Sequence, residues 1–272
     1  MSVTDKQLKS FRKIVWDYYR KRGRRTLPWR NTRDSYKIFV SELMLQQTQV
    51  QRVSPKYAEF LKLFPSVQAL ATAPLSEALK AWQGLGYNRR AKFLHQLAQE
   101  VVKNYRGKLP ATEAELLLLP GIGKATAAAM LAFAFNKPTT YLETNVRSVF
   151  LHHFFSDRQG VDDGELLPLI ARAAEDQDPR TWNWALLDYG AYIKATHGNP
   201  NKKSKHYAKQ SKFEGSNRQV RGAVLRLLGD GGMKESDLVS ALGLDTERVL
   251  KSVVGLLKEG LISKRRGYLR LG

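Results

Sequence analysis

The sequence predicts a mainly α-helical core followed by a small C-terminal winged-helix-like domain. Apolar residues recur at helical spacing through most of residues 1–195. Proline and glycine interrupt this pattern at short intervals, as expected for a bundle of short helices. No long alternation of apolar and polar residues occurs before residue 215, which argues against a sheet-based core.

The first helices follow from the spacing of large apolar residues. Leu8, Phe11 and Val15 recur on one face of a helix that stops at the basic run Lys21–Arg25. The stretch Tyr36–Gln51 has a similar pattern and predicts a second helix over its whole length. Further short helices are expected after the next helix breakers, at Pro55, Pro65, Pro74 and Gly86.

A helical hairpin is predicted in the middle of the chain. Thr112 and Glu115 form a capping-box pattern at the start of a helix that reaches Leu119. A turn with two glycines follows over residues 120–123. The second helix of the hairpin is expected over Lys124–Phe135, and its many alanines permit close packing.

Composition indicates where the core ends. Residues 194–212 carry six lysines and no acidic residue, together with Gly, Asn, Pro and Ser, which is typical of a linker. We therefore expect a helical core at 1–195, a basic linker at 196–215 and the C-terminal domain at 216–272. The last of these is expected to hold three helices and a two-stranded hairpin, at Arg218–Gly229, Glu235–Leu242, Asp245–Glu259 and Leu261–Leu271.

Charge and composition narrow the class of function. The chain has 45 Lys and Arg against 25 Asp and Glu, and its net charge of +20 favours a polyanionic partner such as nucleic acid. It has no cysteine, which excludes disulfides, thiolate zinc fingers and cysteine-ligated iron–sulfur clusters. No apolar stretch is long enough for a bilayer, and the polar start Met1–Lys13 lacks a secretion signal. We expect a cytoplasmic protein, in the nucleoid if bacterial, that makes no membrane contact.

The turn between the two hairpin helices has the features of a phosphate-binding site. Gly121 and Gly123 let the backbone turn tightly and approach another surface. The following helix directs its free N–H groups and the positive end of its dipole outward, beside Lys124. Such a site would hold a DNA backbone without reading bases. An ordinary helical hairpin would need the same glycines, so the turn alone leaves both interpretations open.

Two glutamates are candidates for acid–base chemistry. Glu42 precedes the apolar run Leu43–Leu45, and burial there would raise its pKa toward values that suit a general acid. Glu143 could stay ionised and stabilise a cationic sugar, as one carboxylate does in glycoside hydrolysis. Taken alone, either residue could equally be a carboxylate on a helix surface, or for Glu143 at a helix cap.

Several motifs occur in a characteristic order: Leu27–Arg30, Met44–Val50, Gly84–Tyr87, Leu119–Gly123 and Asn145–Arg147. Their order and spacing, from about residue 8 to residue 195, resemble the helix-hairpin-helix DNA glycosylase superfamily. The hairpin is shared across that superfamily. The run Leu-Gln-Gln-Thr-Gln-Val is characteristic of its adenine DNA glycosylase (MutY-type) branch.

The resemblance implies a two-lobed glycosylase core and specific catalytic roles. Glu42 matches the acid that protonates the leaving base, Glu143 replaces an Asp that stabilises the oxocarbenium-like sugar, and Asn145 matches an Asn of that pattern. Gln46 and Tyr87 match residues that enter the duplex, one filling the space of the flipped base and the other wedging beside the opposite base. Such extrusion is required because the glycosidic bond is inaccessible in stacked DNA.

The resemblance also implies residues that hold the base and the DNA backbone. Arg30 and Gln47 match residues that line the base pocket, and Asp188 matches an acidic residue near it. DNA phosphates are expected at the hairpin and at the start of a later helix, namely at Gly121, Gly123, Lys124 and Arg147. The pair Arg89–Arg90 could touch phosphates or be solvated.

The chain departs from the family pattern in four respects. Glu143 is one methylene longer than the Asp of the pattern. The family usually carries four cysteines after the region that matches Leu187–Gly190, and they hold an iron–sulfur cluster. This chain has its basic stretch there instead. Its basic residues could still bind phosphate, while other packing replaces the structural role of the cluster. Ala125 stands where pyrimidine-specific lyases have the lysine that forms a Schiff base. The tail is too short for the β-rich domain that often checks for 8-oxoguanine.

These observations predict a monofunctional base-excision-repair glycosylase that acts as a monomer on duplex DNA containing a lesion or mismatch. The expected substrate is adenine opposite 8-oxoguanine or guanine. No cofactor and no metal site are expected, although a monovalent cation at the hairpin is compatible with the resemblance. His95, His152 and His153 are expected to be packing or surface residues. Two alternatives remain: a different lesion, such as a mismatched or modified pyrimidine or an alkylated or bulky base, or a DNA-binding homologue with weakened catalysis.

Overall fold

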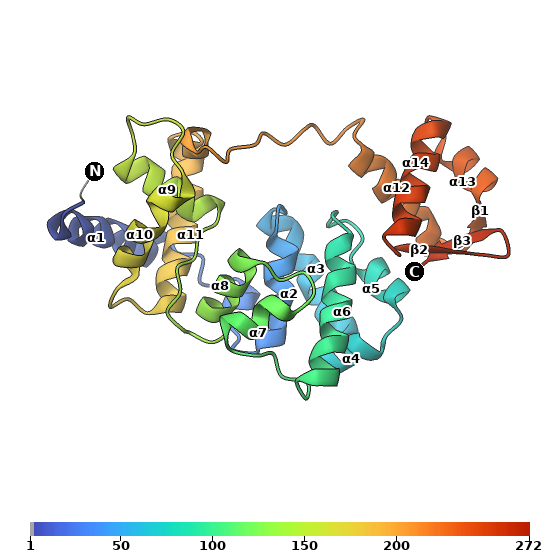
Figure 1. The fold of residues 1–272 in the computed structure, drawn as a ribbon, viewed down its shortest axis with the longest axis horizontal. Helices are drawn as coiled ribbons and strands as arrows, with labels where there is room; N and C mark the ends of the chain where they lie inside the picture. The colour runs from blue at the N-terminus through green and yellow to red at the C-terminus, as the bar shows by residue number, and fades with distance from the viewer. Residues whose placement is uncertain (1–2) are drawn as a thin grey trace. The chain divides into compact units, whose positions relative to one another are not determined.

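The computed structural model describes residues 3–272, and Met1 and Ser2 lie outside the described part. Its helices and strands are labelled in Figure 1. Contacts along the chain define two compact units, each built from several segments. The first comprises residues 3–38, 111–118 and 122–209, and the second comprises 39–110, 119–121 and 210–272. None of the helices in residues 3–272 combines the length and the apolar character that crossing a membrane would need.

The first unit is a helical bundle with an aromatic centre. Phe11 packs against Phe150 and edge-on to Trp182, which brings three helices together. Capping boxes at Thr4 and Asp162 begin two of its helices. Its elements are α1 (Asp5–Arg22), η1 (Pro28–Arg30), α7 (Glu113–Leu118), α8 (Lys124–Phe133), α9 (Thr144–Phe154), α10 (Asp163–Ala174), α11 (Pro179–Thr196) and η2 (Pro200–Lys203).

The second unit begins with a set of helices that surround a buried tryptophan. Trp82 lies edge-on to Phe60, and Leu94 and Leu97 are fully buried on the inner face of their helix. Helix α2 starts in the first unit and continues into the second. The helices are α2 (Ser35–Leu45), α3 (Val50–Leu63), α4 (Val67–Thr72), α5 (Leu75–Ala81) and α6 (Arg89–Asn104).

The C-terminal part of the second unit is a small module of helices and short strands. Its three strands form one antiparallel sheet in the order β1-β3-β2. The hairpin of β2 and β3 was predicted, whereas β1 is too short to leave a periodic pattern in the sequence. The elements are α12 (Asn217–Asp230), β1 (Met233–Lys234), α13 (Glu235–Leu242), α14 (Thr246–Lys258), β2 (Ile262–Arg265) and β3 (Tyr268–Leu271).

The prediction of one helix over Tyr36–Gln51 is wrong. Helix α2 ends at Leu45, and α3 begins at Val50. Between them, Gln47 has a left-handed backbone with φ of 52°, which an α-helix cannot contain. The apolar pattern continues across this break, so periodicity alone could not detect it.

The range expected as a linker, 196–215, is divided in the structure. Asn201 is buried and donates hydrogen bonds to the Thr144 carbonyl oxygen (3.1 Å) and to Ser148 Oγ (2.7 Å). Residues 203–205 also hydrogen-bond with the backbone of Val161. This first half therefore belongs to the first unit, while residues 207–212 have no helix or strand.

Candidate active site

Arg90 joins the end of helix α2 to the loop 84–87 within the second unit. Its buried guanidinium donates hydrogen bonds to the carbonyl oxygen of Leu43 (2.6 Å) and to that of Gln46. The same guanidinium donates to the carbonyl oxygen of Gly86 (3.0 Å) in the loop. One charged side chain thus satisfies the last carbonyl groups of α2 and fixes both segments that carry the predicted duplex-entering residues.

The buried position of Arg90 corrects the expectation that the pair Arg89–Arg90 is either solvated or bound to phosphate. Burial lowers the pKa of Arg90 to about 10, and the nearby Tyr87 hydroxyl partly opposes this effect. The group therefore remains charged at neutral pH. Arg89 is exposed, as the solvated alternative requires, with its Nε 3.9 Å from the Glu259 carboxylate.

Gln47 and Tyr87 both have left-handed backbones, with φ of 52° and 49°. Such conformations are unfavourable by about 1–3 kcal/mol for residues with a side chain and gather at functional sites. The Tyr87 hydroxyl accepts a hydrogen bond from Arg218 (3.0 Å) and also contacts Gln210. Gln210 in turn donates to Gln47 Oε1 (3.3 Å). Within the second unit, residues from the C-terminal part therefore contact two of the predicted DNA-binding side chains.

Glu42 lies on helix α2, about one turn before the helix ends. Its neighbours Ser41 and Leu43 are buried, whereas Glu42 itself is half-buried. The residue is therefore neither fully exposed nor sealed in the core. The placement agrees with a proton donor, and the role itself stays a prediction.

Glu143 caps helix α9 in the first unit. Its Oε1 accepts hydrogen bonds from the backbone N–H groups of Asn145 (2.5 Å) and Val146 (3.0 Å). Its Oε2 lies 3.4 Å from Asn145 Nδ2, and Asn145 Oδ1 accepts a hydrogen bond from Lys194 Nζ (3.2 Å). The helix-cap alternative that the sequence left open is thus present in the structure. The backbone hydrogen bonds of the cap involve Oε1, whereas Oε2 faces the Asn145 amide.

The acidity of Glu143 reflects opposing influences. Burial raises its pKa, while hydrogen bonds from the Val146 and Asn145 amides and the charges of Lys194 and Arg147 act to lower it. Burial is the larger effect, so the pKa of Glu143 lies above that of an ordinary glutamate. A role that needs the ionised form therefore requires a pH above this raised value.

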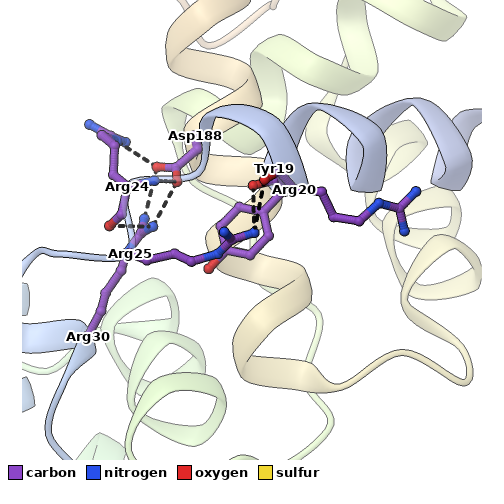
Figure 2. A network of polar contacts seen from close by, with 6 residues as sticks. All are labelled: Tyr19, Arg20, Arg24, Arg25, Arg30 and Asp188. Atoms are coloured by element: carbon purple, nitrogen blue, oxygen red, sulfur yellow. Dashed lines mark hydrogen bonds and ion pairs between the residues drawn. The ribbon is translucent and has the colours of Figure 1, made fainter.

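Arg30 and Asp188 are brought together as a buried ion pair (Figure 2). Arg30 donates to both carboxylate oxygens of Asp188, at 2.7 and 2.9 Å. Arg24 adds hydrogen bonds from its backbone N–H (2.8 Å) and its Nε (2.6 Å). Burial acts to raise the pKa of Asp188, but the hydrogen bonds and charges of the two arginines outweigh it and hold that pKa below its usual value. Arg30 also lies over the Trp184 ring, with 5.3 Å from its Cζ to the ring centre.

This network limits what Asp188 can do in a base pocket. Both of its oxygens already accept hydrogen bonds from arginine, so a base could reach Asp188 only if one arginine moved. The geometry indicates that Asp188 orients Arg30 and keeps its guanidinium in place. The pocket roles of both residues stay predictions.

The hairpin turn has the conformation that its glycines suggested. Gly121 has φ of 78°, and a Cβ there would lie 2.6 Å from the Phe93 Cβ, so the close approach to α6 requires glycine. Gly123 is the N-cap of α8, with no side-chain cap and open space where a Cβ would be. Lys124 is exposed beside it. These features agree with the predicted phosphate site, which stays a prediction.

Arg147, one of the predicted phosphate ligands, forms an ion pair with a carboxylate of the protein itself. Its Nε and Nη2 donate to the two carboxylate oxygens of Asp163 at 2.8 and 2.7 Å. Such a bidentate pair is well oriented and holds the guanidinium in place. A phosphate at Arg147 would therefore compete with Asp163.

The histidine side chains have partners within the protein, and His152 lies against the rings of His153 and His197. His95 Nε2 lies 2.8 Å from a backbone carbonyl oxygen, and His153 Nε2 lies 2.9 Å from the Tyr189 hydroxyl. Burial lowers the pKa of His153 to about 4, assisted by His152 and His197. Across residues 3–272, no group of three or more His, Cys, Asp or Glu side chains could hold a metal ion. A cysteine-ligated iron–sulfur cluster does not fit this sequence, which contains no cysteine.

The predicted residues fall into two groups, one in each unit. The structure brings Glu143 together with Asn145, and Arg30 together with Asp188, in the first unit. The second unit holds Glu42, Gln46, Gln47 and Tyr87.

The sequence did not reveal the buried bridging role of Arg90, and it did not single out Lys194. Arg90 precedes the buried Leu94 and Leu97 by four and seven positions, so it falls on the apolar face of α6. Lys194 follows Gly190 by four positions and therefore shares its face of α11. Helical spacing was thus an available signal for both residues.

Substitution Arg90→Met is expected to destabilise the protein by about 3 kcal/mol or more, because it leaves several buried carbonyl oxygens without a donor. Urea unfolding of the wild type and the variant measures this loss. Arg89→Met is the matched control: that side chain is 62% exposed, and a change within about 0.5 kcal/mol is expected. Equal destabilisation by both substitutions would contradict the bridging role of Arg90.

Comparisons with known proteins identify relatives along most of the chain. Residues 40–166 match the HhH-GPD superfamily of base excision DNA repair proteins. The adenine DNA glycosylase of Mycobacterium tuberculosis is 32% identical over 268 residues, covering 89% of this chain and 87% of the relative. That of Buchnera aphidicola subsp. Baizongia pistaciae is 36% identical over 187 residues, covering 67% of this chain and 52% of the relative. The chain thus spans about half the length of this second relative.

Solved structures agree with this relationship. A thermostable thymine-DNA glycosylase superposes with a TM-score of 0.63 at 28% identity, covering 74% of this chain and 94% of that one. A non-covalent endonuclease III–DNA complex gives a TM-score of 0.61 at 18% identity, covering 72% and 90%, and supports the fold alone. The mainly helical glycosylase fold predicted from the motifs is therefore confirmed. The chain belongs to the HhH-GPD superfamily of base excision DNA repair proteins, among relatives that are adenine DNA glycosylases.

Proposed function

We propose that this protein is a monofunctional DNA glycosylase that removes adenine opposite 8-oxoguanine or guanine from duplex DNA. Like its relatives named adenine DNA glycosylases, it would hydrolyse the bond between the base and the sugar. We further propose that it acts as a monomer on cellular DNA in the cytoplasm. Its net charge of +20 supports a polyanionic partner.

The proposed reaction begins when the target nucleotide leaves the stack. Gln46 fills the vacated space and Tyr87 wedges beside the opposite base, while Arg30 and Gln47 hold the extruded adenine. Glu42 then protonates the base, which makes it a better leaving group. Glu143 stabilises the positive charge that develops on the sugar. Water attacks the sugar, and the products are free adenine and an abasic site.

One observation carries this proposal. Helix α2 presents Glu42 half-exposed among buried neighbours and ends just before Gln46 and Gln47. Arg90 ties that end to the loop of Tyr87. One buried guanidinium thereby joins the segment of Gln46, which follows the helix of Glu42, to the loop of Tyr87. This arrangement suits a reaction in which base extrusion and protonation must occur together.

The DNA backbone is proposed to bind at the hairpin and at the C-terminal module. Gly121, Gly123 and Lys124 would hold a phosphate through the free backbone N–H groups at the start of α8. Carbonyl oxygens of the turn could bind a monovalent cation. Arg265 and Arg266 at the β2–β3 hairpin would contact a second stretch of backbone. The hydrogen bonds of Asn201 support the view that packing replaces the usual iron–sulfur loop.

A second candidate is removal of thymine from mismatches. The similarity to a thermostable thymine-DNA glycosylase, at 28% identity over 74% of this chain, favours it. Glu143 is one methylene longer than the aspartate of the pattern, and this departure is also compatible with a different target base.

A panel of duplexes tests these proposals. Single-turnover reactions would use adenine opposite 8-oxoguanine, adenine opposite guanine, thymine opposite guanine and an alkylated purine, with the released base identified by mass spectrometry. Release of adenine is expected. Release of thymine alone would favour the second candidate, and duplex binding without release of any base would indicate a DNA-binding homologue instead.

A further inference from the structure

Helix α11 approaches the start of α9 very closely at Gly190. A Cβ at this position would lie 2.2 Å from the carbonyl oxygen of Asn145, so only glycine permits the contact. Lys194 lies one helical turn further along the same face of α11. The packing of the two helices therefore delivers the Lys194 side chain to the Asn145 side chain, where Nζ donates to Oδ1 at 3.2 Å.

This hydrogen bond determines which way the Asn145 amide points. An ammonium group can only donate, so the amide oxygen must face Lys194 and the amide nitrogen must point away from it. In that orientation Asn145 Nδ2 lies 3.4 Å from Glu143 Oε2, the oxygen that does not accept the backbone hydrogen bonds of the cap. Lys194, Asn145 and Glu143 thus form an ordered chain of polar groups.

Lys194 also differs from the other cation near Glu143. Arg147, on α9, is held by both carboxylate oxygens of Asp163, which offsets its charge. Lys194, on α11, makes its hydrogen bond to a neutral amide instead. Of the two charged groups that act on Glu143, Lys194 is therefore the one whose positive charge is not offset by a bound carboxylate.

We propose that Lys194 is a positioning residue for base excision: it fixes the Asn145 amide beside Glu143, and its positive charge favours the carboxylate form of Glu143. The inference rests on the proposed glycosylase function. It assigns a task to the first residue of the basic stretch 194–212, which the sequence related only to phosphate binding and packing. Lys194 acts through Asn145 and Glu143, and it need not contact the DNA.

The test compares three variants by two independent measurements. Lys194→Met removes the charge and the donor, Lys194→Arg restores both, and Lys202→Met removes a charge from an exposed lysine of the neighbouring η2 segment. Carbon-13 NMR titration of the Glu143 side-chain carboxyl carbon reports its pKa without any reaction. Single-turnover release of adenine between pH 5 and 9 reports catalysis.

Lys194→Met is expected to raise the measured pKa of Glu143 and to move the acid limb of the rate profile upward by the same amount. Each pH unit of that movement lowers the rate on the limb by about tenfold. Lys194→Arg is expected to bring the pKa of Glu143 and the acid limb of the rate profile most of the way back to their wild-type positions. Lys202→Met is expected to leave the position of the limb unchanged. Thermal unfolding shows whether each variant is folded at the pH of assay.

Two results would overturn the inference. One is a uniform loss of rate at every pH with an unchanged Glu143 titration, which would indicate only a packing or DNA-binding role. The other is a borohydride-trapped complex with DNA in the wild type that is absent in Lys194→Met, which would make Lys194 a nucleophile. If the wild type releases no base at all, the proposed function fails, but the NMR titration still decides whether Lys194 controls Glu143.

Discussion

Glu42→Gln is expected to slow the release of adenine by about 10²–10⁴-fold under single-turnover conditions, because an amide cannot supply the proton that the departing base needs. Gln has nearly the same shape and can still accept hydrogen bonds. The half-buried position on α2 should therefore tolerate it without loss of fold. Affinity for the duplex is expected to remain that of the wild type, since the substitution removes no positive charge.

The matched control for this substitution is Glu77→Gln. Glu77 is exposed on helix α5 of the same unit, and the change likewise replaces a carboxyl group by an amide. Its excision rate should equal that of the wild type. A Glu42→Gln protein that binds duplex and releases adenine at the wild-type rate would remove Glu42 from the mechanism. Equal losses in both variants would instead point to a general effect of charge.

The sequence was sufficient to predict those features of the fold that depend on residues close together in the chain. The residues of the Thr112 capping-box pattern and of the hairpin turn are close together in the sequence. In the structure Thr112 Oγ1 accepts the backbone hydrogen bond of Glu115, and Gly121 has the left-handed backbone of the turn. The end of helix α2 was not predictable, because the donor that satisfies its carbonyl groups is Arg90, on another helix. Strand β1 was missed since it is defined only by pairing with β3.

The same distinction applies to the candidate site. A family resemblance in residue types and spacing pointed to Glu42, Glu143 and Asn145. The roles predicted for them depend on the residue types within the motifs. Spacing could not show that Asp188 is already saturated by two arginines, nor that Lys194 reaches Asn145. Both contacts depend on helices that pack across long separations in sequence, so they become visible only in the folded chain.

Glu143→Gln is expected to slow excision by about 10²-fold or more while making the protein more stable at neutral pH. The rate falls because the neutral amide cannot stabilise a cationic sugar. The stability rises because burial raises the pKa of Glu143, so the folded state disfavours the charged form. The Gln side chain can still accept the hydrogen bonds from the Asn145 and Val146 amides, and the helix cap is kept.

The pH dependence of this stability gain has a definite sign. Below the pKa of the unfolded chain, Glu143 is protonated in both states, so wild type and variant should unfold at the same temperature. As pH rises through the raised pKa of the folded protein, the wild type loses stability relative to Glu143→Gln, and the difference in Tm becomes constant above it. Thermal unfolding of both proteins from pH 3 to pH 9 follows the difference in Tm from the low-pH limit upward.

Asp178→Asn supplies a control of opposite sign. Asp178 caps helix α11 in the same unit, and although burial acts to raise its pKa, hydrogen bonds from Thr181 and Asn136 hold that pKa below its usual value. Removing its charge should therefore lower Tm at neutral pH and leave the excision rate unchanged. If Glu143 is only a helix cap, Glu143→Gln will keep the wild-type rate and Glu143→Ala will lose about 1 kcal/mol of stability. A catalytic carboxylate instead requires the rate to fall with Gln, in a protein that has become harder to unfold.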